Sequence, residues 1–287
     1  YDVGEHNEMR LHGADWNDAL DMAWEKGESV AFTCAYAGNL RNIAKTLRQL
    51  EEISGSSKIE IAHEMEDLLA GSVELYEDAA RKQALLAGYA KKCEHNISGD
   101  TIIVRLDQLA ANLEGKADWM MKNIRANEWV KDGEDGWFNG YYDNHGRKVE
   151  GVMDESVRMM LTGQVFAIMS GTATEDQVES ICRSADKYLY DQKAGGYRLN
   201  TNFHEEKFDL GRMFGFAYGE KENGAVLMDT ESRKKLLSEW QNKKKEMITH
   251  PYLKEKMEWG MVPYVQAMLL ARFLRGDLDG YPVFLWK

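Results

Sequence analysis

The 287-residue sequence has few cysteines, no long apolar run and no initiator methionine. Cys34, Cys93 and Cys182 are odd in number and far apart, which argues against a disulfide framework or a zinc site and favours a reducing, cytoplasmic compartment. No run of about eighteen apolar residues predicts a membrane span. No segment resembles a secretion signal, and the start at Tyr1 favours a fragment of a longer protein.

Proline and positive charge are both scarce in the first 226 residues. All three prolines, Pro251, Pro263 and Pro282, lie in residues 227–287, although prolines at a usual frequency of about 5% would be expected throughout. Residues 227–287 carry 11 Lys and Arg against 8 Asp and Glu, whereas residues 1–226 have 25 against 40. Two compositions therefore meet near residue 226, and we predict domains at 1–226 and 227–287. The acidic balance argues against nucleic-acid binding outside the basic tail.

Apolar residues recur at three- and four-residue steps through most of the first segment. This spacing predicts helices over 28–53, 59–92, 104–126, 157–170 and 174–190, the last opened by a capping box from Thr174 to Gln177. Elaborate loops separate them. Long helices with their loops at one end favour an all-α fold, an α/α barrel or a solenoid. In the tail, we predict two further helices over 232–247 and 261–275.

The aromatic, glycine-rich stretch 135–142 precedes a turn signal at Asp143-Asn144-His145-Gly146. We predict a loop or short hairpin here, with His145 exposed at its tip. Its aromatic rings either anchor the loop to the core or line a sugar cleft, and the residues alone leave both interpretations open.

The densest chemistry lies in the stretch from Arg10 to Asp21, RLHGADWNDALD. A helix would stack Asp15, Asp18 and Asp21 on one face, so a turn leading into a helix is the simpler interpretation. A second interpretation is functional. A carboxyl beside a flat ring suits a sugar site, because the ring stacks under the pyranose while the acid protonates the glycosidic oxygen.

Three ordered segments resemble the inverting glycoside phosphorylases that act on cellobiose, chitobiose and β-1,2-oligoglucans, with the β-1,2-oligoglucan branch the most similar. They are Gly13–Asp18 (GADWND) followed by Gly27–Val30 (GESV), Gly195–Thr201 (GGYRLNT), and Gly211–Gly224 (GRMFGFAYGEKENG). The resemblance implies an incomplete (α/α)6 barrel with elaborate loops, followed by a short helical C-terminal tail.

The resemblance also implies a reaction of the glycosyltransferase type. Inorganic phosphate is the co-substrate and attacks a β-linked glucooligosaccharide with inversion, giving an α-sugar 1-phosphate with no further cofactor and no metal. Because phosphate is the nucleophile, the protein supplies a single carboxyl as general acid. The matching residue is Asp18, whose pKa burial and neighbours such as Asp15 would have to raise. Trp16, Asp15, Lys221 and Glu222 match substrate-binding positions, and a homodimer of the full-length protein is compatible with the family.

The sequence also departs from this family. A phosphate-binding histidine and a Thr-Gly pair follow the KENG segment in the family, whereas Gly224 runs on here to Leu227-Met228-Asp229-Thr230. The N-terminal β-sandwich and the first barrel helices would lie before Tyr1. We therefore expect an isolated chain with the acid but without the phosphate site, and so without phosphorolysis.

Residues 227–287 resemble another family, the C-terminal end of the CRISPR-associated spacer-acquisition integrase. The resemblance rests on His250-Pro251, on Pro263–Ala267 (PYVQA) and on the final Phe284-Leu285-Trp286-Lys287. The metal ligands of that enzyme precede the matching region, so His250 is interpreted as structural. Three hypotheses follow: part of a phosphorylase joined to an integrase tail by fusion or assembly artefact, a non-catalytic carbohydrate-binding or scaffold protein, and a nucleic-acid protein acting through its tail.

Overall fold

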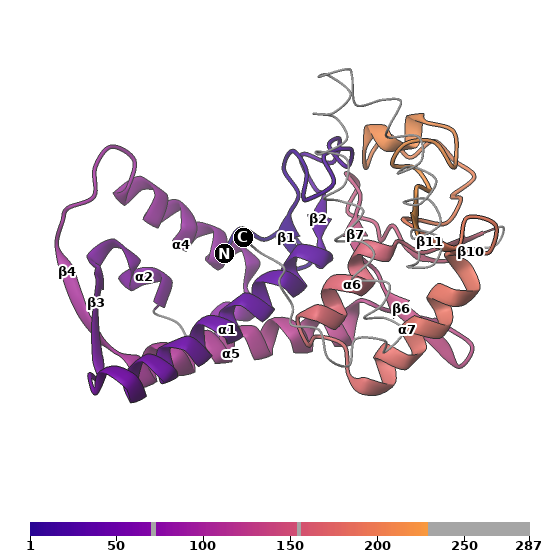
Figure 1. The fold of residues 1–287 in the computed structure, drawn as a ribbon. Coiled ribbons are helices and arrows are strands. Elements are labelled where there is room, and N and C mark those ends of the chain that lie inside the picture. The colour runs from indigo at the N-terminus through magenta and orange to yellow at the C-terminus, as the bar shows by residue number, and fades with distance from the viewer. Residues whose placement is uncertain (70–72, 154–155, 229–287) are drawn as a thin grey trace, which may run out of the picture.

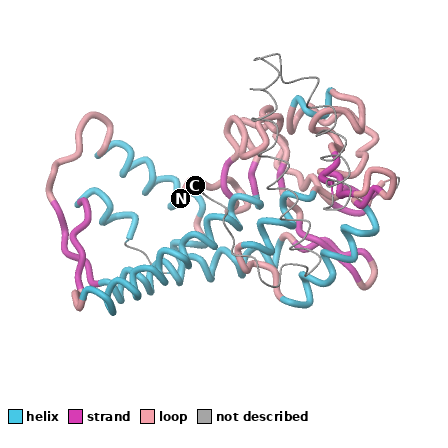
Figure 2. The backbone as a smooth tube through the Cα atoms, viewed as in Figure 1, coloured by secondary structure: helices cyan, strands magenta, loops and turns pink. Residues whose placement is uncertain are grey.

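The computed structural model describes residues 1–69, 73–153 and 156–228, and the two helices expected in the tail lie outside these residues. The described chain forms two regions, shown in Figure 1. We call residues 40–120 the arm, which reaches away from the rest of the molecule. Residues 1–39 and 121–228 form the body, which contains most of the short strands and loops (Figure 2).

Helices α1 (Val30–Ser54) and α5 (Leu106–Asn127) run side by side from the body into the arm (Figure 1). Helix α1 begins at Ser29, whose side chain accepts a hydrogen bond from the backbone N–H of Phe32, and ends at Gly55, whose φ of 66° suits glycine. The contact between the helices is lined by small, fully buried residues, which let the two backbones approach closely: Ala37, Ala44, Ala110 and Ala117.

The far end of the arm holds a two-stranded antiparallel ribbon, and the helices between its two strands lead back to the body, where Asn7 Nδ2 donates to the carbonyl of Glu77 at 2.9 Å. Strand β3 (Lys58–Ala62) pairs with β4 (Thr101–Arg105), and η1 (His63–Met65), α2 (Glu66–Leu69), α3 (Val73–Glu77) and α4 (Ala79–Lys92) lie between them in the chain. A small apolar cluster joins the ribbon to the long helices: Ala44, Leu47, Leu106, Leu109 and Ala110, with Ile59, Leu69, Val104 and Leu113 against it.

The body combines small sheets with two helices. One sheet has the order β1 (Met9–Arg10), β2 (Glu28–Ser29), β7 (Tyr141–Tyr142), and another has β10 (Tyr190–Asp191), β11 (Gly196–Arg198), β12 (Val226–Met228). Two hairpins, β5 (Trp129–Asp132) with β6 (Asp135–Phe138) and β8 (Gly151–Val152) with β9 (Val157–Arg158), lie beside each other, and β6 packs against α6 (Leu161–Met169) and α7 (Glu175–Tyr188). The short η2 (Arg212–Gly215) lies beside Ala19, in the loop that precedes β2.

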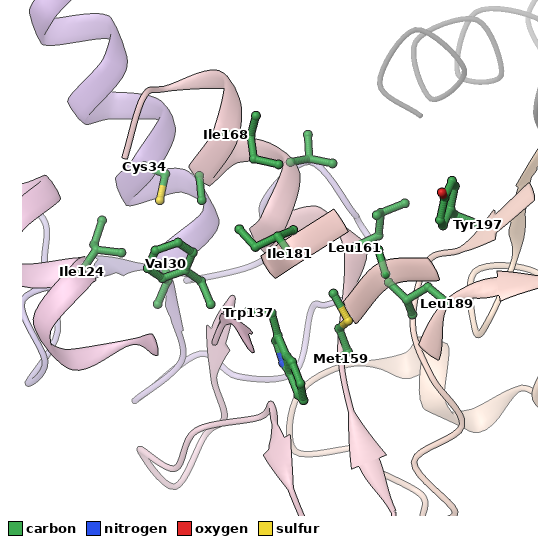
Figure 3. Close-up of a cluster of buried hydrophobic side chains, with 14 of the residues drawn as sticks. Val30, Cys34, Ile124, Trp137, Met159, Leu161, Ile168, Ile181, Leu189 and Tyr197 are labelled. Atoms are coloured by element: carbon green, nitrogen blue, oxygen red, sulfur yellow. The ribbon is translucent and has the colours of Figure 1, made fainter. Parts of the chain in front are cut away.

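The main core of the body lies between α1, α6, α7 and the β5–β6 hairpin. Figure 3 shows how its side chains converge from segments far apart in the sequence, among them Cys34, Trp137, Ile181 and Leu189. A second cluster lies under the loop that precedes β2 and contains Leu20, Tyr141, Phe203, Met213 and Phe214. The aromatic stretch at 135–142 is thus largely core, since Trp137, Phe138, Tyr141 and Tyr142 are all buried.

Several expected elements are confirmed. Helices occupy 30–54, 106–127 and 175–188, and the capping box of Thr174 and Gln177 is present in full. The turn at 143–146 closes with the N–H of Asp143 donating to the carbonyl of Arg147, and His145 is exposed at its tip.

The all-α expectation is wrong in part, because the described residues also form small sheets between their helices. A single helix over 59–92 does not form. Its first residues pair instead as β3 with β4, a strand some forty residues later, and the remainder divides into short helices. The helix expected from 157 begins only at Leu161, after strand β9. Strand β12 runs across the composition boundary at residue 226 and pairs with β11.

Candidate functional site

The stretch from Gly13 to Asp21 is a loop of successive turns and does not lead directly into a helix. Asp15 Oδ1 accepts from the N–H of Asn17 at 3.0 Å, and Asn17 Oδ1 accepts from the N–H of Ala19 at 3.1 Å. Side chains of this kind satisfy backbone donors locally and so compete with a helix. The turns predicted here are confirmed, but they do not lead directly into a helix, because the nearest one, α1, begins only at Val30.

The loop is held in place by the segment 207–216. The N–H of Met213 donates to the carbonyl of Ala19 at 3.1 Å, and the N–H of Met22 donates to the carbonyl of Leu210 at 3.2 Å. Gly211 lies so close that a Cβ added there would meet the carbonyl oxygen of Ala19 at 2.1 Å. Glycine is thus required at 211 by the close approach of two backbones.

Asp15 is attached to the start of helix α1. Its Oδ2 accepts from the hydroxyl of Ser29 at 3.0 Å, and Ser29 is the residue that caps the helix. Burial raises the pKa of Asp15, although the N–H of Asn17 and the Ser29 hydroxyl oppose the rise. Asp15 is thus a buried carboxyl that attaches the GADWND loop to α1.

The hydroxyl of Tyr141 lies buried beside Asp15. The ring is fully buried, and the hydroxyl interacts with the carboxyl of Asp15 and with the side chain of Thr162. Burial, and then the neighbouring charge of Asp15, raises the pKa of Tyr141. The sequence placed Tyr141 in an aromatic stretch but gave no signal that its hydroxyl would lie next to this carboxyl, because the two residues are more than a hundred positions apart.

Trp16 and Asp18, in contrast, project from the loop. The Trp16 residue is 48% exposed, and Asp18 is exposed as well. A proton donor would have to be buried, but this chain leaves the carboxyl of Asp18 exposed. An indole held at a loop tip by buried neighbours leaves a ring face available for stacking.

Lys221 and Glu222 lie in a second loop, 219–224, whose C-terminal end is fixed by Asn200. The Asn200 side chain accepts from the N–H of Gly224 at 2.7 Å and donates to Asn223 Oδ1 at 3.0 Å. Both Lys221 and Glu222 are exposed. Lys221 adopts a φ of 48°, which is uncommon outside glycine, and its ammonium lies 4.3 Å from the centre of the Phe216 ring.

The fold therefore brings together the three segments singled out in the sequence. The first contacts the third through Asn17, whose Nδ2 donates to Met213 Sδ at 3.7 Å, and the second contacts the third through Asn200 and Gly224. Within the described part of the chain, no hydrogen bond or ion pair joins Asp18 to Lys221 or Glu222. The structure thus assembles the segments without bringing these exposed groups into contact.

Buried charged residues beside this site were not anticipated from the sequence. Asp143 Oδ2 accepts from Lys207 Nζ at 2.8 Å, and both side chains are almost fully buried. Burial would raise the pKa of Asp143, but Lys207 and neighbouring backbone N–H groups outweigh it and hold that pKa well below its usual range. Glu150 accepts from the N–H of Met160 at 2.5 Å, and burial raises its pKa to about 8.

No group of three or more His, Cys, Asp or Glu in the described ranges could hold a metal ion. None of the helices described is long and apolar enough to cross a membrane.

Comparison with known proteins supports the first resemblance. The catalytic domain of the glycosyl hydrolase 94 superfamily matches residues 104–235. A solabiose phosphorylase of Paenibacillus borealis is 25% identical over 225 residues, which cover 78% of this chain and 22% of that protein.

A second set of relatives matches a much shorter segment. A protein named CRISPR-associated endonuclease Cas1 2, of Rhodospirillum rubrum, is 54% identical over 66 residues, which is 23% of this chain and 19% of that protein. CRISPR-associated endonuclease Cas1 1 of Chlorobaculum tepidum is 44% identical over 84 residues, covering 29% and 22% of the two chains.

The chain resembles two families. Residues 1–226 resemble the inverting glycoside phosphorylases, and residues 227–287 resemble the C-terminal end of the CRISPR-associated integrase. The chain spans about a fifth of the length of the Rhodospirillum, Chlorobaculum and Paenibacillus relatives. The phosphorylase match extends past residue 226, as strand β12 does.

Proposed function

We propose that residues 1–226 form part of the catalytic domain of an inverting phosphorylase that acts on a β-linked glucooligosaccharide. The helices α1, α5, α6 and α7 would then belong to an (α/α)6 barrel whose other helices come from outside residues 1–226. One observation carries the proposal. Two loops carry the proposed site residues, one with Trp16 and Asp18 and the other with Lys221 and Glu222. The first loop is hydrogen-bonded to Met213 and the second to Asn200, and the segments 195–201 and 211–224 that contain these two residues are themselves hydrogen-bonded to each other.

In this proposal Asp18 is the general acid. Its carboxyl protonates the glycosidic oxygen while inorganic phosphate attacks the anomeric carbon from the opposite face, so the products are an α-sugar 1-phosphate and a shortened sugar. Because Asp18 is exposed in the chain alone, a bound sugar has to supply the desolvation that keeps the acid protonated.

The remaining site residues would bind the sugar. Trp16 offers the exposed ring on which a pyranose stacks, and Asp15 fixes the loop through Ser29. Lys221 and Glu222 offer a donor and an acceptor for sugar hydroxyls. We expect negligible phosphorolysis by the chain alone, since the phosphate-binding histidine and Thr-Gly pair of the family have no counterpart after Gly224.

Sugar binding and turnover test this proposal separately. Calorimetric titration with β-linked glucooligosaccharides should show saturable binding that is lost in Trp16→Ala and kept in Asp18→Asn. Tyr36→Ala is the matched control, because Tyr36 is 47% exposed, much as Trp16 is, but lies on helix α1 outside the GADWND segment. Equal loss of binding in both aromatic variants, or no binding by the wild-type chain, would refute the proposed sugar site.

Turnover is measured as release of α-glucose 1-phosphate from the oligosaccharide and phosphate. No release is expected from the wild-type chain. Release that Asp18→Asn abolishes would overturn the expected inactivity and establish the acid. Binding without any release, also when residues 1–226 replace the matching part of the Paenibacillus solabiose phosphorylase, would favour a non-catalytic carbohydrate-binding protein.

The short matches to CRISPR-associated endonucleases favour a second candidate, a nucleic-acid protein acting through residues 227–287. That segment has a net charge of +3, against −15 for the remainder. This candidate predicts DNA binding that weakens with added salt and is lost when residues 227–287 are removed. Binding that survives the truncation would exclude it.

A further inference from the structure

The loop between Gly13 and Trp24 closes on itself. The N–H of Leu11 donates to the carbonyl of Gly27 at 2.9 Å, so the two chain segments that flank the loop lie next to each other. At this neck the ring of Trp24 lies against Gly13, where an added Cβ would meet the ring atom Cζ2 at 3.4 Å. Compact surface loops whose ends meet in this way are frequently functional.

The loop exposes two indole rings. Trp24 is 61% exposed, and Trp16 is 48% exposed. Tryptophan is highly buried on average, so two exposed indoles in one short loop indicate a surface that a ligand covers. Gly13, which the ring of Trp24 contacts, is three residues before Trp16, so the Cα atoms of Gly13 and Trp16 are at most about 11 Å apart. A short chain of sugar rings can therefore contact both indoles.

The backbone beside Trp24 is held in place by the turn at 143–146. Asn144 Oδ1 accepts from the N–H of Glu25 at 2.8 Å and from the N–H of Lys26 at 3.1 Å. The chain next to the ring is thus fixed while the ring itself faces solvent. A platform that is already ordered loses little conformational freedom when a ligand stacks on it.

The charge of the loop favours an uncharged ligand. Between residues 13 and 26 the sequence has one basic residue, Lys26, against four acidic residues: Asp15, Asp18, Asp21 and Glu25. The bases of single-stranded nucleic acid also stack on tryptophan, but their phosphates would be repelled by this acidic surface. A neutral sugar meets no such repulsion, and its hydroxyls can donate to the exposed carboxylates.

We propose that Trp24 is a second sugar platform, which binds a further unit of the oligosaccharide that stacks on Trp16. This inference rests on the sugar site proposed above and extends it, because Trp24 then determines the length of sugar chain that the site prefers. A disaccharide held at Trp16 and Asp18 does not reach the neck of the loop. A longer oligosaccharide contacts both rings and binds more tightly.

The dependence of affinity on chain length tests the proposal. Calorimetric titration of the full chain with β-linked glucooligosaccharides, from the disaccharide to the pentasaccharide, should show affinity that increases with length. In Trp24→Ala the increase should disappear, which for the pentasaccharide is a loss of about tenfold, while the affinity for the disaccharide stays unchanged. Trp24→Tyr supplies another aromatic ring and should restore much of the increase.

A matched variant separates stacking from closure of the loop. Gly13→Ala alters the same neck, but its methyl group would meet the ring of Trp24 at an ordinary contact distance and leave both indoles in place. It should therefore keep the dependence on chain length. Circular dichroism of each variant reports whether the chain remains folded. Equal weakening of all oligosaccharides in Trp24→Ala would show that the ring only closes the loop, and would overturn the proposal.

Other outcomes would also overturn it. An unchanged dependence on length in folded Trp24→Ala would leave the sugar site of Trp16 intact but exclude the second platform. Failure of the wild-type chain to bind any oligosaccharide would refute the sugar site as a whole. Binding of single-stranded DNA that is lost in Trp24→Ala would assign the ring to nucleic acid. A wild-type dimer that Trp24→Ala converts to a monomer, as measured by light scattering, would assign the ring to a second copy of the chain.

Discussion

The body and the arm are stabilised in different ways. In the body, two clusters of large apolar side chains surround buried charges such as Asp143 and Lys207, each with several partners. In the arm, a smaller cluster and a seam of alanines hold two long helices together, and the ion pairs between those helices are exposed. The body can therefore hold loops in fixed positions, whereas the arm presents surface. The following predictions test this contrast.

The largest effect is expected for the buried ion pair of the body. Lys207→Met leaves the buried Asp143 carboxylate with only the exposed Arg147 as a counter-ion, and removing one partner of a buried pair costs about 3–5 kcal/mol. The free energy of unfolding from urea titration measures this loss. The matched arm variant, Arg41→Met, removes an exposed cation and should cost far less. Similar losses in both variants would contradict the contrast.

Truncation of the two cores should give the next largest effect. Ile181 is fully buried in the main cluster, so Ile181→Ala should cost about 3–4 kcal/mol through lost burial and a residual cavity. Leu109 is at the margin of the arm cluster, and Leu109→Ala should cost about 2 kcal/mol. Hydrogen exchange should also show α4 and the ribbon opening before the body does. Slower exchange in the arm would reverse this order.

The two regions should respond to pH with opposite sign. Burial raises the pKa of Glu150 in the body to about 8, so the folded state retains a proton that the unfolded state has released above about pH 4.5. This contribution to stability is therefore lost as pH rises from 4.5 to 8. In Glu150→Gln the decline over that window should disappear, as thermal unfolding across pH would show.

In the arm, burial lowers the pKa of Lys82 and of Lys116 to about 8. The unfolded chain then binds more protons than the folded chain between pH 8 and 10.5, so stability should rise with pH over that window. Lys116→Met should flatten the rise. If stability still rises between pH 8 and 10.5 in the double variant Lys82→Met/Lys116→Met, groups other than these two lysines cause the rise.

The smallest effect is expected for the exposed pair between α1 and α5. Arg41 Nη2 and Asp118 Oδ1 are 2.6 Å apart, and both side chains face solvent. A double-mutant cycle with Arg41→Ala and Asp118→Ala should give a coupling below about 1 kcal/mol, and added salt should reduce it further. A coupling as large as that of Asp143 with Lys207 would remove the distinction between arm and body.

Prediction from the sequence succeeded where structure is local. The span of α1 follows from apolar spacing and from its caps, and the start of α7 follows from a four-residue capping box. It failed for residues 59–92, because β3 is stabilised by β4, which lies too far along the chain for periodicity to show. The same division holds for the site. Its three segments could be identified from the sequence, but the contacts that join them through Met213 and Asn200 could not be predicted.

The sequence by itself determined the long helices, their caps, the turn at 143–146 and the residues that resemble a phosphorylase. These depend on neighbours within a few positions. Only the tertiary structure decided that Asp15 would be attached to α1 while Asp18 remained exposed, and that Asp143 would be buried against Lys207. The reason is physical. Burial and pairing of a charge depend on groups from distant segments, and their effect on its pKa exists only once the chain has packed.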